Sequence, residues 1–487
     1  MRREPFPVLR IYLACIDAFI IPARYAWTMV GYILGFRAAF VTAPEDAQLV
    51  YGYTPPEDKE ATWIPASRDA HMFLLHQNPY PVEALKEIVW KEHSAISLFH
   101  LDGLAAEHIP SDLVSAVFFF LSQHEEWSIP DRDKYNRFQA ASSVLGKAGL
   151  LSRPVVYEYA GMIAHACVLG GIELPDKARY NGKSSAIVLT HDIDFIWKSR
   201  PSWFVREMLR TVKSRNEESL ASRIQNLLSY AKPPNPASDP YARSINEMYR
   251  LEEAADIRST WFFKAGGRAR EDIRYSLQQP FVQSHFERLK TAKHEVGIHP
   301  SFDAYVDSFM FERELFALES ASDRDILSCR QHYLRSEYPE TARIQSDLGI
   351  RYDSTLGFAE HEGFRNGTCH PFLLYDHEAG KPIPVWEIPL IAMDGTLKQY
   401  RGLSPEDSFM RIRELVNTVQ RCRGAAALLF HNTIYDPHEW EGWSGVFERT
   451  IDMIGEQGIY SVPIGEVVPL WTGSQNPAEI AAEIYPP

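Results

Sequence analysis

The sequence predicts an α/β protein in which a distorted (β/α) barrel follows a smaller, mixed α+β accessory domain. The length of 487 residues is too great for one small core, because domains hold roughly 100 to 200 residues. After about residue 182, short β-rich runs alternate with helical stretches, as in a parallel sheet with crossover helices. Five or more such units in about 300 residues favour a barrel over an open sheet.

Composition and charge narrow the classes of function. Hydrophobic residues make up 45% of the chain and charged residues 23%, which excludes wholesale disorder, collagen and a coiled coil. With 64 acidic and 50 basic side chains, the formal charge is -14. A protein that binds nucleic acid regardless of sequence needs basic groups to neutralise phosphates, so we expect no nucleic-acid partner.

The cysteines indicate the compartment. They are five in number, scattered, and never form a C-x-x-C pair. We therefore expect neither a disulfide framework nor a thiolate zinc site, and a reducing, cytoplasmic location fits best. These residues are Cys15, Cys167, Cys329, Cys369 and Cys422.

An apolar stretch over residues 8–36 is the candidate for membrane contact. Arg10, Asp17 and Arg24 interrupt it, so that its longest uncharged piece, residues 25–36, has 12 residues. A spanning helix needs roughly 18 to 20, and no small-residue cleavage signal follows, so we expect neither a membrane span nor a secretory signal. We predict a packed amphipathic helix, with a weak membrane-surface contact through residues 8–36 as the alternative.

Two helices are predicted in the accessory domain. One begins at Asp112, whose side chain can cap free backbone donors. The other covers residues 154–169, with a proline in its first turn and two glycines just past its end. The polar, turn-rich segment that follows marks a boundary, so that residues 1–182 form the accessory domain and residues 183–487 the barrel.

The predicted strands of the barrel are short apolar runs. Residues 199–244 interrupt their order and are predicted to be a helical insertion followed by a loop. The runs are SAIVLTHD, STWFFKAG, HEVGIHP, ILSCRQHYL, WEIPLI, AALLFHN and IYSVPI.

The first of these runs ends in residues that can bind a metal or move a proton. It delivers Asp192 and Asp194 at the carboxyl end of a strand, where α/β barrels build their active sites. Two carboxylates spaced by one residue point to one side of an extended chain, so one can bind a cation while the other takes a proton. Taken alone, the pair is more simply explained as an Asx-turn that closes the strand.

The run HEVGIHPSFDAY brings His299 to the end of another strand. Neutral imidazole nitrogen beside carboxylate oxygen suits a borderline-soft ion such as zinc. Asp303 lies four residues on and faces the same way if the chain turns helical after Pro300. A single histidine is more often structural, so this spacing is weak evidence by itself.

Three further polar clusters close or follow apolar runs. They are residues 330–333 (RQHY), residues 351–355 (RYDST) and residues 425–432 (AAALLFHN). Each cluster alone is ordinary. Five such clusters in one linear order, most of them at the end of an apolar run, are hard to explain as surface decoration.

Taken together, LTHDID, HEVGIHPSF, RQHY, YDSTLGF and LLFHN resemble the five motifs of the NodB-type polysaccharide deacetylases, carbohydrate esterases (family four) that remove N-acetyl groups from sugars. They are most similar to a bacterial branch with a Thr-His-Asp-x-Asp motif, and the resemblance covers roughly residues 184–470. The stretch over residues 112–156 is similar to the uncharacterised N-terminal domain of that branch. The resemblance implies a deacetylase barrel that acts on an N-acetylated sugar or polysaccharide.

The resemblance also implies catalytic roles. Asp192 matches the base that deprotonates a metal-bound water, and Arg330 matches the arginine that orients this base. His431 matches the histidine that protonates the departing amine, and Asp353 matches the acid that keeps this histidine charged. Leu429 matches a residue that lines the pocket for the acetyl methyl group.

The implied cofactor is a divalent metal, with Zn²⁺ as the first choice. Asp194 matches the metal-binding carboxylate and His299 the first metal histidine. The second metal histidine of the family falls at Asp303, so the third ligand is either Asp303 or His332, which occupies the usual proline position of the third motif. Harder oxygen ligands weaken the discrimination for zinc over other divalent ions.

Further residues and two alternative functions complete the prediction. Tyr333 and Trp440 are candidates for substrate binding, although buried aromatic rings are more often core. Asn432 replaces an acid beside His431. If the metal site is incomplete, the protein binds glycan without cleaving it, as a scaffold in surface-polysaccharide biosynthesis. A metal-independent amide hydrolase on the same scaffold is the other alternative.

Overall fold

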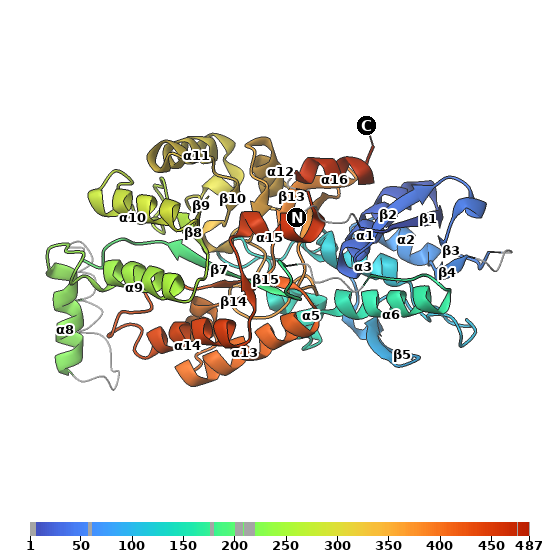
Figure 1. Ribbon diagram of the computed structural model, residues 1–487, viewed down its shortest axis with the longest axis horizontal. Coiled ribbons are helices and arrows are strands. Elements are labelled where there is room, and N and C mark those ends of the chain that lie inside the picture. Colours follow the sequence, from blue (N-terminus) through green and yellow to red (C-terminus); the bar gives the residue numbers. More distant parts are fainter. Residues whose placement is uncertain are drawn as a thin grey trace.

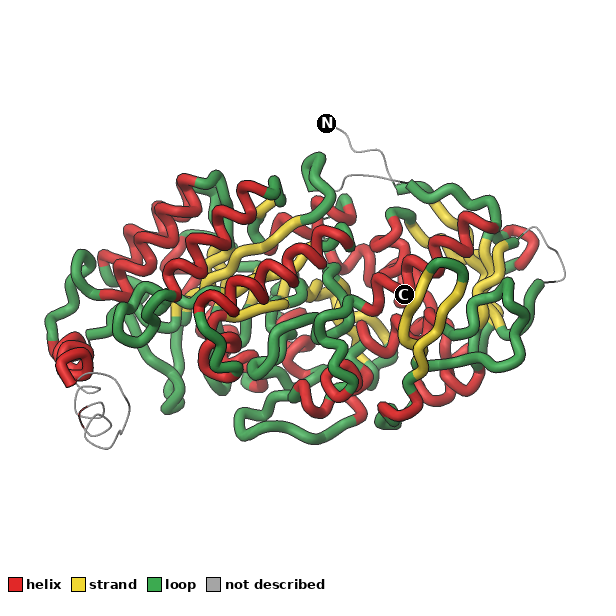
Figure 2. The backbone as a smooth tube through the Cα atoms, turned by 90° about the horizontal axis from the view of Figure 1, so that it is seen from below, coloured by secondary structure: helices red, strands yellow, loops and turns green. Residues whose placement is uncertain are grey.

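The computed structural model describes residues 6–56, 61–175, 180–199, 208, 220–474 and 476–486. Within them the chain forms two large sheets (Figure 1, Figure 2). A four-stranded parallel sheet near the N-terminus has the strand order β2-β1-β3-β4. A ten-stranded sheet has the order β12-β13-β11-β10-β9-β8-β7-β15-β14, with β16 beside β7. The predicted α/β class is confirmed.

The N-terminal unit contains the four-stranded sheet and a separate hairpin, β5–β6. Its strands are β1 (Val8–Ala14), β2 (Arg37–Val41), β3 (Leu49–Gly52), β4 (Thr62–Pro65), β5 (Lys86–Trp90) and β6 (His93–Ser97). Its α-helices in the described chain are α1 (Ile20–Leu34), α2 (Arg68–Leu74), α3 (Leu113–Leu121), α4 (His124–Ser128), α5 (Val144–Lys147) and α6 (Val155–Leu169).

The apolar N-terminal stretch is a strand followed by a helix, so the predicted packed helix is confirmed over Ile20–Leu34 and not over the residues before it. Along β1, exposed Val8 and Arg10 alternate with buried Leu9 and Ile11, which is the two-residue period of a strand. The helix α1 is buried along most of its length and packs against α3, β2 and α6. Its apolar side chains face protein, so the predicted weak membrane-surface contact through residues 8–36 has no support here.

Among the described residues, no helix combines the length and the apolar character needed to span a membrane.

The other two helices predicted for this unit are confirmed. The helix α3 begins after Asp112, whose carboxylate accepts a hydrogen bond from the backbone N–H of Ser115 at 2.9 Å and so caps the helix. The helix α6 begins after Pro154 and ends at Leu169, with Gly170 directly beyond it. At the ends of both helices, side chains accept from free backbone N–H groups or, in the case of proline, the free N–H is missing. Local sequence predicts both helices because these end residues can be recognised in it.

A buried carboxyl group lies on α4. Glu125 accepts a hydrogen bond from the backbone N–H of Val144. Burial raises the pKa of Glu125 from 4.5 to about 7, although this hydrogen bond and the cations Lys147 and Arg365 act in the opposite direction.

Replacing Glu125 with glutamine is expected to change how stability depends on pH. An acid whose pKa is raised on folding contributes most below its unfolded pKa of 4.5, and this contribution is lost as the pH rises through about 7. Glutamine keeps the acceptor oxygen but does not ionise. Relative to the wild type, the variant should gain about 3 kcal/mol of unfolding free energy between about pH 4 and about pH 8. Urea unfolding at several pH values measures this gain, and a constant difference across that range contradicts it.

The larger unit contains the ten-stranded sheet and the helices around it. Its strands are β7 (Ala186–Ile193), β8 (Thr260–Phe263), β9 (Glu295–Ile298), β10 (Ser328–Cys329), β11 (Tyr352–Asp353), β12 (Phe372–Asp376), β13 (Lys381–Glu387), β14 (Leu390–Met393), β15 (Ala425–Leu429) and β16 (Tyr460–Ser461). Its described α-helices are α8 (Leu220–Ala231), α9 (Pro240–Ala254), α10 (Pro280–Thr291), α11 (Ser308–Ser322), α12 (Glu340–Asp347), α13 (Pro405–Arg421), α14 (Trp443–Glu456), α15 (Ile464–Thr472) and α16 (Pro477–Ile484). Figure 1 shows α10 and α11 above the sheet and α13 and α14 below it.

A single segment joins β13, the second strand from one end of this sheet, to β14 at the other end. The strand β13 pairs with β11, and β14, which follows it directly, pairs with β15. Between the two strands, the Ile388 N–H donates to the Asp353 oxygen and the Ala427 N–H donates to the Pro389 oxygen, both at 2.8 Å. The sheet therefore curls back on itself, which confirms a barrel-like sheet.

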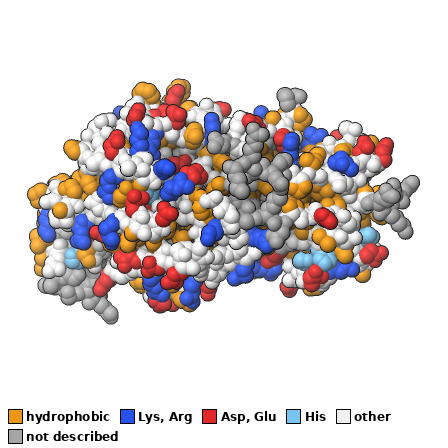
Figure 3. Space-filling view, viewed as in Figure 1, with side chains coloured by type: hydrophobic (Ala, Val, Ile, Leu, Met, Phe, Trp, Pro, Cys, Tyr) orange, Lys and Arg blue, Asp and Glu red, His pale blue; other side chains and the backbone are white. Residues whose placement is uncertain are grey.

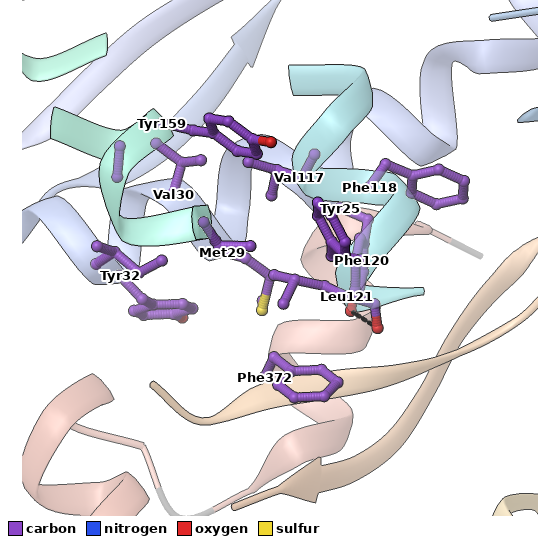
Figure 4. Close-up of a cluster of buried hydrophobic side chains, with 14 of the residues drawn as sticks. Tyr25, Met29, Val30, Tyr32, Val117, Phe118, Phe120, Leu121, Tyr159 and Phe372 are labelled. Carbon is purple, nitrogen blue, oxygen red and sulfur yellow. Dashed lines mark hydrogen bonds between the residues drawn. The ribbon is translucent and has the colours of Figure 1, made fainter. Parts of the chain in front are cut away.

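The two units share one hydrophobic core. The Tyr25 hydroxyl on α1 donates to the backbone oxygen of Leu373 on β12 at 2.5 Å. Tyr25 and Phe118 both meet the ring of Tyr375 edge-on, with centroids 5.2 and 4.9 Å apart. Figure 4 shows Phe372 of β12 facing the same cluster of side chains from α1 and α3. The N-terminal unit is thus packed against the barrel as one continuous interior.

The predicted insertion over residues 199–244 is described in part, and the described part is a helix followed by a loop, as predicted. Apart from residues 199 and 208, it is described from Leu220 onward, as α8 and the start of α9. Lys198, which precedes it, is buried, forms ion pairs with Asp436 and Glu439, and donates a hydrogen bond to Asn226 of α8 at 2.7 Å. These contacts fix the start of the insertion against the barrel.

Candidate functional site

Polar side chains that end or follow five strands meet at one edge of the curled sheet. These strands are parallel, so their carboxyl ends lie at the same edge. The side chains come from β7 (Asp192, Asp194), β9 (His299), β10 (Arg330, His332), β14 (Asp394) and β15 (His431).

Three of these side chains offer ligand atoms to one point. Asp194 Oδ1 lies 3.4 Å from His299 Nε2 and 3.3 Å from His332 Nδ1. The two ring nitrogens are 3.0 Å apart. Asp194 Oδ1 is buried and has no hydrogen-bond partner in the described chain. One carboxylate oxygen and two imidazole nitrogens at this spacing are a donor set that zinc accepts.

The ring of His299 is held in the form that suits a metal, and burial favours the neutral form of His332. His299 Nδ1 lies 2.6 Å from the backbone oxygen of Arg330, so this nitrogen carries the proton and Nε2 presents a lone pair to the cluster. Burial lowers the pKa of His332 well below its ordinary value, although the charge of Asp194 acts in the opposite direction. Neutral imidazole is the form that binds metal ions, so Asp194, His299 and His332 fit a divalent cation.

A buried lysine lies behind the cluster. Lys264 Nζ is 3.1 Å from His332 Nε2 and 3.2 Å from Asp272 Oδ1. The outer nitrogen of a metal-binding histidine usually donates to a carbonyl or carboxylate, and the backbone oxygen of Glu271 is 3.4 Å from the same atom. We did not predict Lys264 from the sequence, where it is one lysine after an apolar run.

Asp303 lies outside the cluster, which corrects its prediction as a metal ligand. Its carboxylate is 59% exposed and contacts Arg335 at 3.3 Å. The prediction required a helical turn directly after Pro300. Instead, Ser301 is held by hydrogen bonds to Glu314 of α11, and a short 3-10 helix begins only after Asp303. The four-residue spacing from the histidine therefore places the carboxylate at the surface.

His431 faces the cluster from the end of β15. Its Nε2 is 3.8 Å from Asp194 Oδ2, and its Nδ1 donates to Asp394 Oδ1 at 2.6 Å. Asp394 also accepts a hydrogen bond from the His431 backbone N–H at 2.8 Å. Burial alone would lower the pKa of His431, but Asp394, Asp194 and Asp192 raise it to about 10. The ring is therefore protonated at neutral pH, with one proton on the nitrogen that faces the cluster.

The acid that pairs with His431 is thus Asp394, which corrects the prediction of Asp353 for this role. Asp353 lies at the end of β11, where it contacts Glu387 and faces the charge of Arg330. Burial raises the pKa of both carboxyl groups, and two such groups in contact share a proton. Asp394 directly follows the apolar run WEIPLIAM, so the strand-end pattern that marked the other candidates could have found it.

Asp192 and Arg330 are both buried next to the cluster. Asp192 Oδ2 is 3.8 Å from His299 Nε2, and Asp192 Oδ1 has no hydrogen-bond partner in the described chain. Arg330 donates from Nη2 to Thr190 Oγ1 at 3.0 Å and to Ser354 Oγ at 3.1 Å. Burial lowers the pKa of Arg330, and the charge of Asp192 opposes this shift. The free oxygen of Asp192 can accept a proton at the cluster.

The three predicted substrate contacts differ in position. Tyr333 packs edge-on against the ring of His332, 4.7 Å between centroids, and has a left-handed backbone with φ 62°. Leu429 is the buried last residue of β15. Trp440 is only 6% exposed and packs against Trp443, so its ring belongs to the core, which corrects the prediction that it binds substrate.

The N-terminal unit reaches this edge of the barrel. Tyr135 packs against the Tyr333 ring, 5.0 Å between centroids. Arg137 donates to the backbone oxygen of Tyr333 and to the hydroxyl of Tyr400, both at 3.1 Å. A row of aromatic rings thus leads from His332 to the N-terminal unit. Local sequence could not have linked these segments, since nearly 200 residues separate them.

Comparisons with known proteins find one family model and several solved structures. Residues 20–167 match a family of unknown function (DUF7033). No curated protein matches the sequence. The structure is similar to a Mycobacterium smegmatis protein assigned as a polysaccharide deacetylase, with 17% identity, coverage of 61% of this chain and 93% of the other, and a TM-score of 0.39.

Two further solved structures are similar at low identity. Puue allantoinase has 16% identity, coverage of 61% of this chain and 90% of the other, and a TM-score of 0.38. The chitin deacetylase of the fungal pathogen Colletotrichum lindemuthianum has 13% identity, coverage of 58% and 86%, and a TM-score of 0.31. Deacetylases are therefore among the structural neighbours of this chain.

Proposed function

We propose that this protein is a metal-dependent hydrolase of carbon–nitrogen amide bonds that removes the acetyl group from an N-acetylated sugar or polysaccharide. The proposal rests on one arrangement. Asp194, His299 and His332 surround a point that the protonated His431 also faces. Amide hydrolysis needs a nucleophile made from water and a proton for the departing amine, and this arrangement can supply both.

Asp194, His299 and His332 would hold the metal ion, and their one oxygen and two nitrogen donors favour zinc. Such an ion, when bound, lowers the pKa of water and polarises the amide carbonyl. Asp192, beside the ligand His299, takes the proton of the attacking water at its free Oδ1. The buried cation of Arg330 compensates the charge of Asp192.

His431 completes the reaction as the acid. An amide is unreactive largely because its nitrogen leaves poorly, so the nitrogen must gain a proton as the bond breaks. The Asp394 carboxylate holds His431 in its charged form and fixes the ring through two hydrogen bonds. The Nε2 proton of His431 therefore points to the place where the amine departs.

The aromatic rings beside the cluster favour a sugar substrate. Tyr333, Tyr135 and Tyr400 are each at least partly exposed, and such rings combine an apolar face with a hydroxyl group. Because Tyr135 comes from the N-terminal unit, we propose that this unit contributes to glycan binding. We also propose a cytoplasmic location, which the five free thiols favour.

Amine release from N-acetylated glycans tests the proposed function. Chelation should abolish the release, and added Zn²⁺ or another divalent ion should restore it. Asp192→Asn keeps the size of the side chain but cannot accept the proton, so the rate should fall by at least about 100-fold. Asp256→Asn, at an exposed carboxylate elsewhere, is the matched control. Amine release by the Asp192→Asn variant at the wild-type rate would show that Asp192 is not the base.

Lys264 favours a second candidate function. Its ammonium group lies 3.1 Å from His332 Nε2, where a positive charge competes with a divalent ion. A metal-independent amide hydrolase on the same scaffold would explain this cation. Turnover that persists in chelated, metal-free protein selects this alternative, whereas sugar binding without turnover under any divalent ion selects a catalytically impaired glycan-binding protein.

A further inference from the structure

Two histidines and a glutamate meet on the surface of the N-terminal unit, away from the strand ends of the barrel. His93 is the first residue of β6, and Glu92 lies in the tight turn that joins β5 to β6. His165 is on the last turns of α6. Glu92 Oε1 lies 2.9 Å from His165 Nδ1 and 3.9 Å from His93 Nε2. The two imidazole centroids are 5.1 Å apart.

The backbone of α6 makes room for this arrangement. Gly161 precedes His165 by one helical turn, and a side-chain carbon at Gly161 would touch His93 Nδ1 at 3.7 Å. The His93 ring therefore lies directly over the helix surface, next to the other imidazole. The neighbouring Lys91 ammonium lies over the ring of Trp90, 5.9 Å from its centroid, and no ion pair joins it to Glu92 in the described chain.

The three groups remain accessible to a dissolved ion. The side chains of His93 and His165 are 32% and 22% exposed, and that of Glu92 is 66% exposed. Figure 3 shows histidine surface beside acidic side chains at the lower right, over the part of the molecule that carries β5 in Figure 1. Nothing in the described chain covers this surface as the core covers His71 and His124 of the same unit.

We infer that Glu92, His93 and His165 form a binding site for a borderline divalent ion such as Zn²⁺, separate from the cluster in the barrel. Ligand atoms around a tetrahedral zinc ion lie about 3.4 Å apart, and the distances of 2.9 and 3.9 Å from the glutamate oxygen to the two imidazole nitrogens bracket this value. Two imidazoles and one carboxylate favour zinc, nickel or copper over magnesium or calcium, which prefer oxygen. The fourth position is left to solvent.

The consequence of this site is an added link between two elements that already pack against each other. The hairpin β5–β6 forms a two-stranded sheet of its own and depends on its packing against α6, because a two-stranded hairpin alone is marginally stable in water. An ion held by Glu92 and His93 on the hairpin and by His165 on α6 fixes the hairpin to the helix. Bound zinc should therefore slow amide hydrogen exchange along the hairpin.

Zinc binding by the full, untagged chain tests the site without reference to activity. The barrel cluster is first disabled by Asp194→Asn combined with His332→Ala, and the protein is stripped of metal. Equilibrium dialysis against micromolar Zn²⁺, followed by elemental analysis, should then find one equivalent. Adding His165→Ala should remove this equivalent, and Glu92→Gln should weaken it by at least tenfold. His76→Ala, at an exposed histidine of the same unit, should leave it unchanged.

Two outcomes would overturn the inference. One is the absence of a bound equivalent in the protein with the disabled barrel cluster, and the other is an equivalent that survives both His165→Ala and Glu92→Gln. Glu92 is on the surface, so its variant gives a result even if the histidine variant does not fold. The outcome is independent of the proposed hydrolase function, because neither the ligands nor the readout involve the barrel site.

Discussion

Replacing His332 with alanine is expected to abolish metal binding at the barrel cluster and, with it, amide hydrolysis. His332 Nδ1 lies 3.3 Å from the Asp194 carboxylate and 3.0 Å from His299 Nε2. Removing it leaves one oxygen and one nitrogen donor, fewer than the three protein ligands of a catalytic zinc site. Loss of an outer-shell partner typically costs 10- to 100-fold in affinity, so the loss of a ligand should cost at least about 100-fold.

The matched control is Asp303→Ala, which removes the other candidate for the same role. Its carboxylate is exposed and pairs with Arg335, so metal affinity and rate should stay within about twofold of the wild type. Zinc titration of both variants, with glycan turnover measured at each zinc concentration, separates the two residues. The reverse pattern, with Asp303→Ala losing zinc and His332→Ala keeping it, would show that the cluster is not the metal site.

The strand-end residues could be predicted because they depend on local sequence. An apolar run that ends in acids or histidines predicts both a strand and the edge at which its polar residues lie. Asp192, Asp194, His299, Arg330 and His431 were predicted in this way, and the structure brings all five to one edge. The assignment of their roles stays a proposal.

The sequence left Asp303 and His332 as alternatives and could not decide which of them lies in the cluster, because this depends on turns that follow the strands. His332 is followed by Tyr333 and Leu334, which both have a left-handed backbone, with φ of 62° and 56°. Neither residue type favours this conformation, so nothing in RQHYL signals the turn that sets the direction of the histidine. The prediction of Asp303 as a ligand assumed a helical turn directly after Pro300, but the 3-10 helix begins only after Asp303.

The partner of His431 was missed for a different reason, namely long-range strand order. Asp353 is the last residue of β11 and Asp394 directly follows β14, so position at a strand end does not distinguish them. The strand β14 pairs with β15, with Met393 opposite Leu429, and this pairing places Asp394 beside His431. The strand β11 pairs with β10 and β13, which lie far from β15 in the strand order. Asp353 therefore lies beside Glu387 and Arg330 and not beside His431.

The same strand order leads to an expected result for Asp394→Asn. The variant keeps the shape of the side chain but removes the charge that holds the pKa of His431 at about 10. Burial, which lowers this pKa, then has less opposition, so the value should fall toward or below the ordinary 6.5. At neutral pH His431 would lose its proton and could no longer act as an acid, and loss of a general acid costs about 100- to 10,000-fold in rate.

The pH dependence distinguishes this electrostatic effect from a structural one. An acid must be protonated to act, so the Asp394→Asn rate should fall at a lower pH than the wild-type rate, because the variant lacks the carboxylate charge that raises the pKa of His431. The contribution of His431 to the free energy of unfolding also decreases as the pH rises. A histidine whose pKa rises on folding contributes most below its unfolded value near 6.5, and the contribution is lost as the pH rises through about 10.

Two measurements check this expectation, the rate of amine release against pH and the NMR titration of the His431 ring in metal-free protein. Asp353→Asn is the informative comparison, because Asp353 shares a proton with Glu387 and does not contact His431 in the described structure. It should leave the titration of His431 in place, whatever it does to the rate. If Asp353→Asn moves this titration and Asp394→Asn does not, then Asp353 is the acid that keeps His431 charged, as the family resemblance implies. In that case the short contact to Asp394 does not set the pKa of His431.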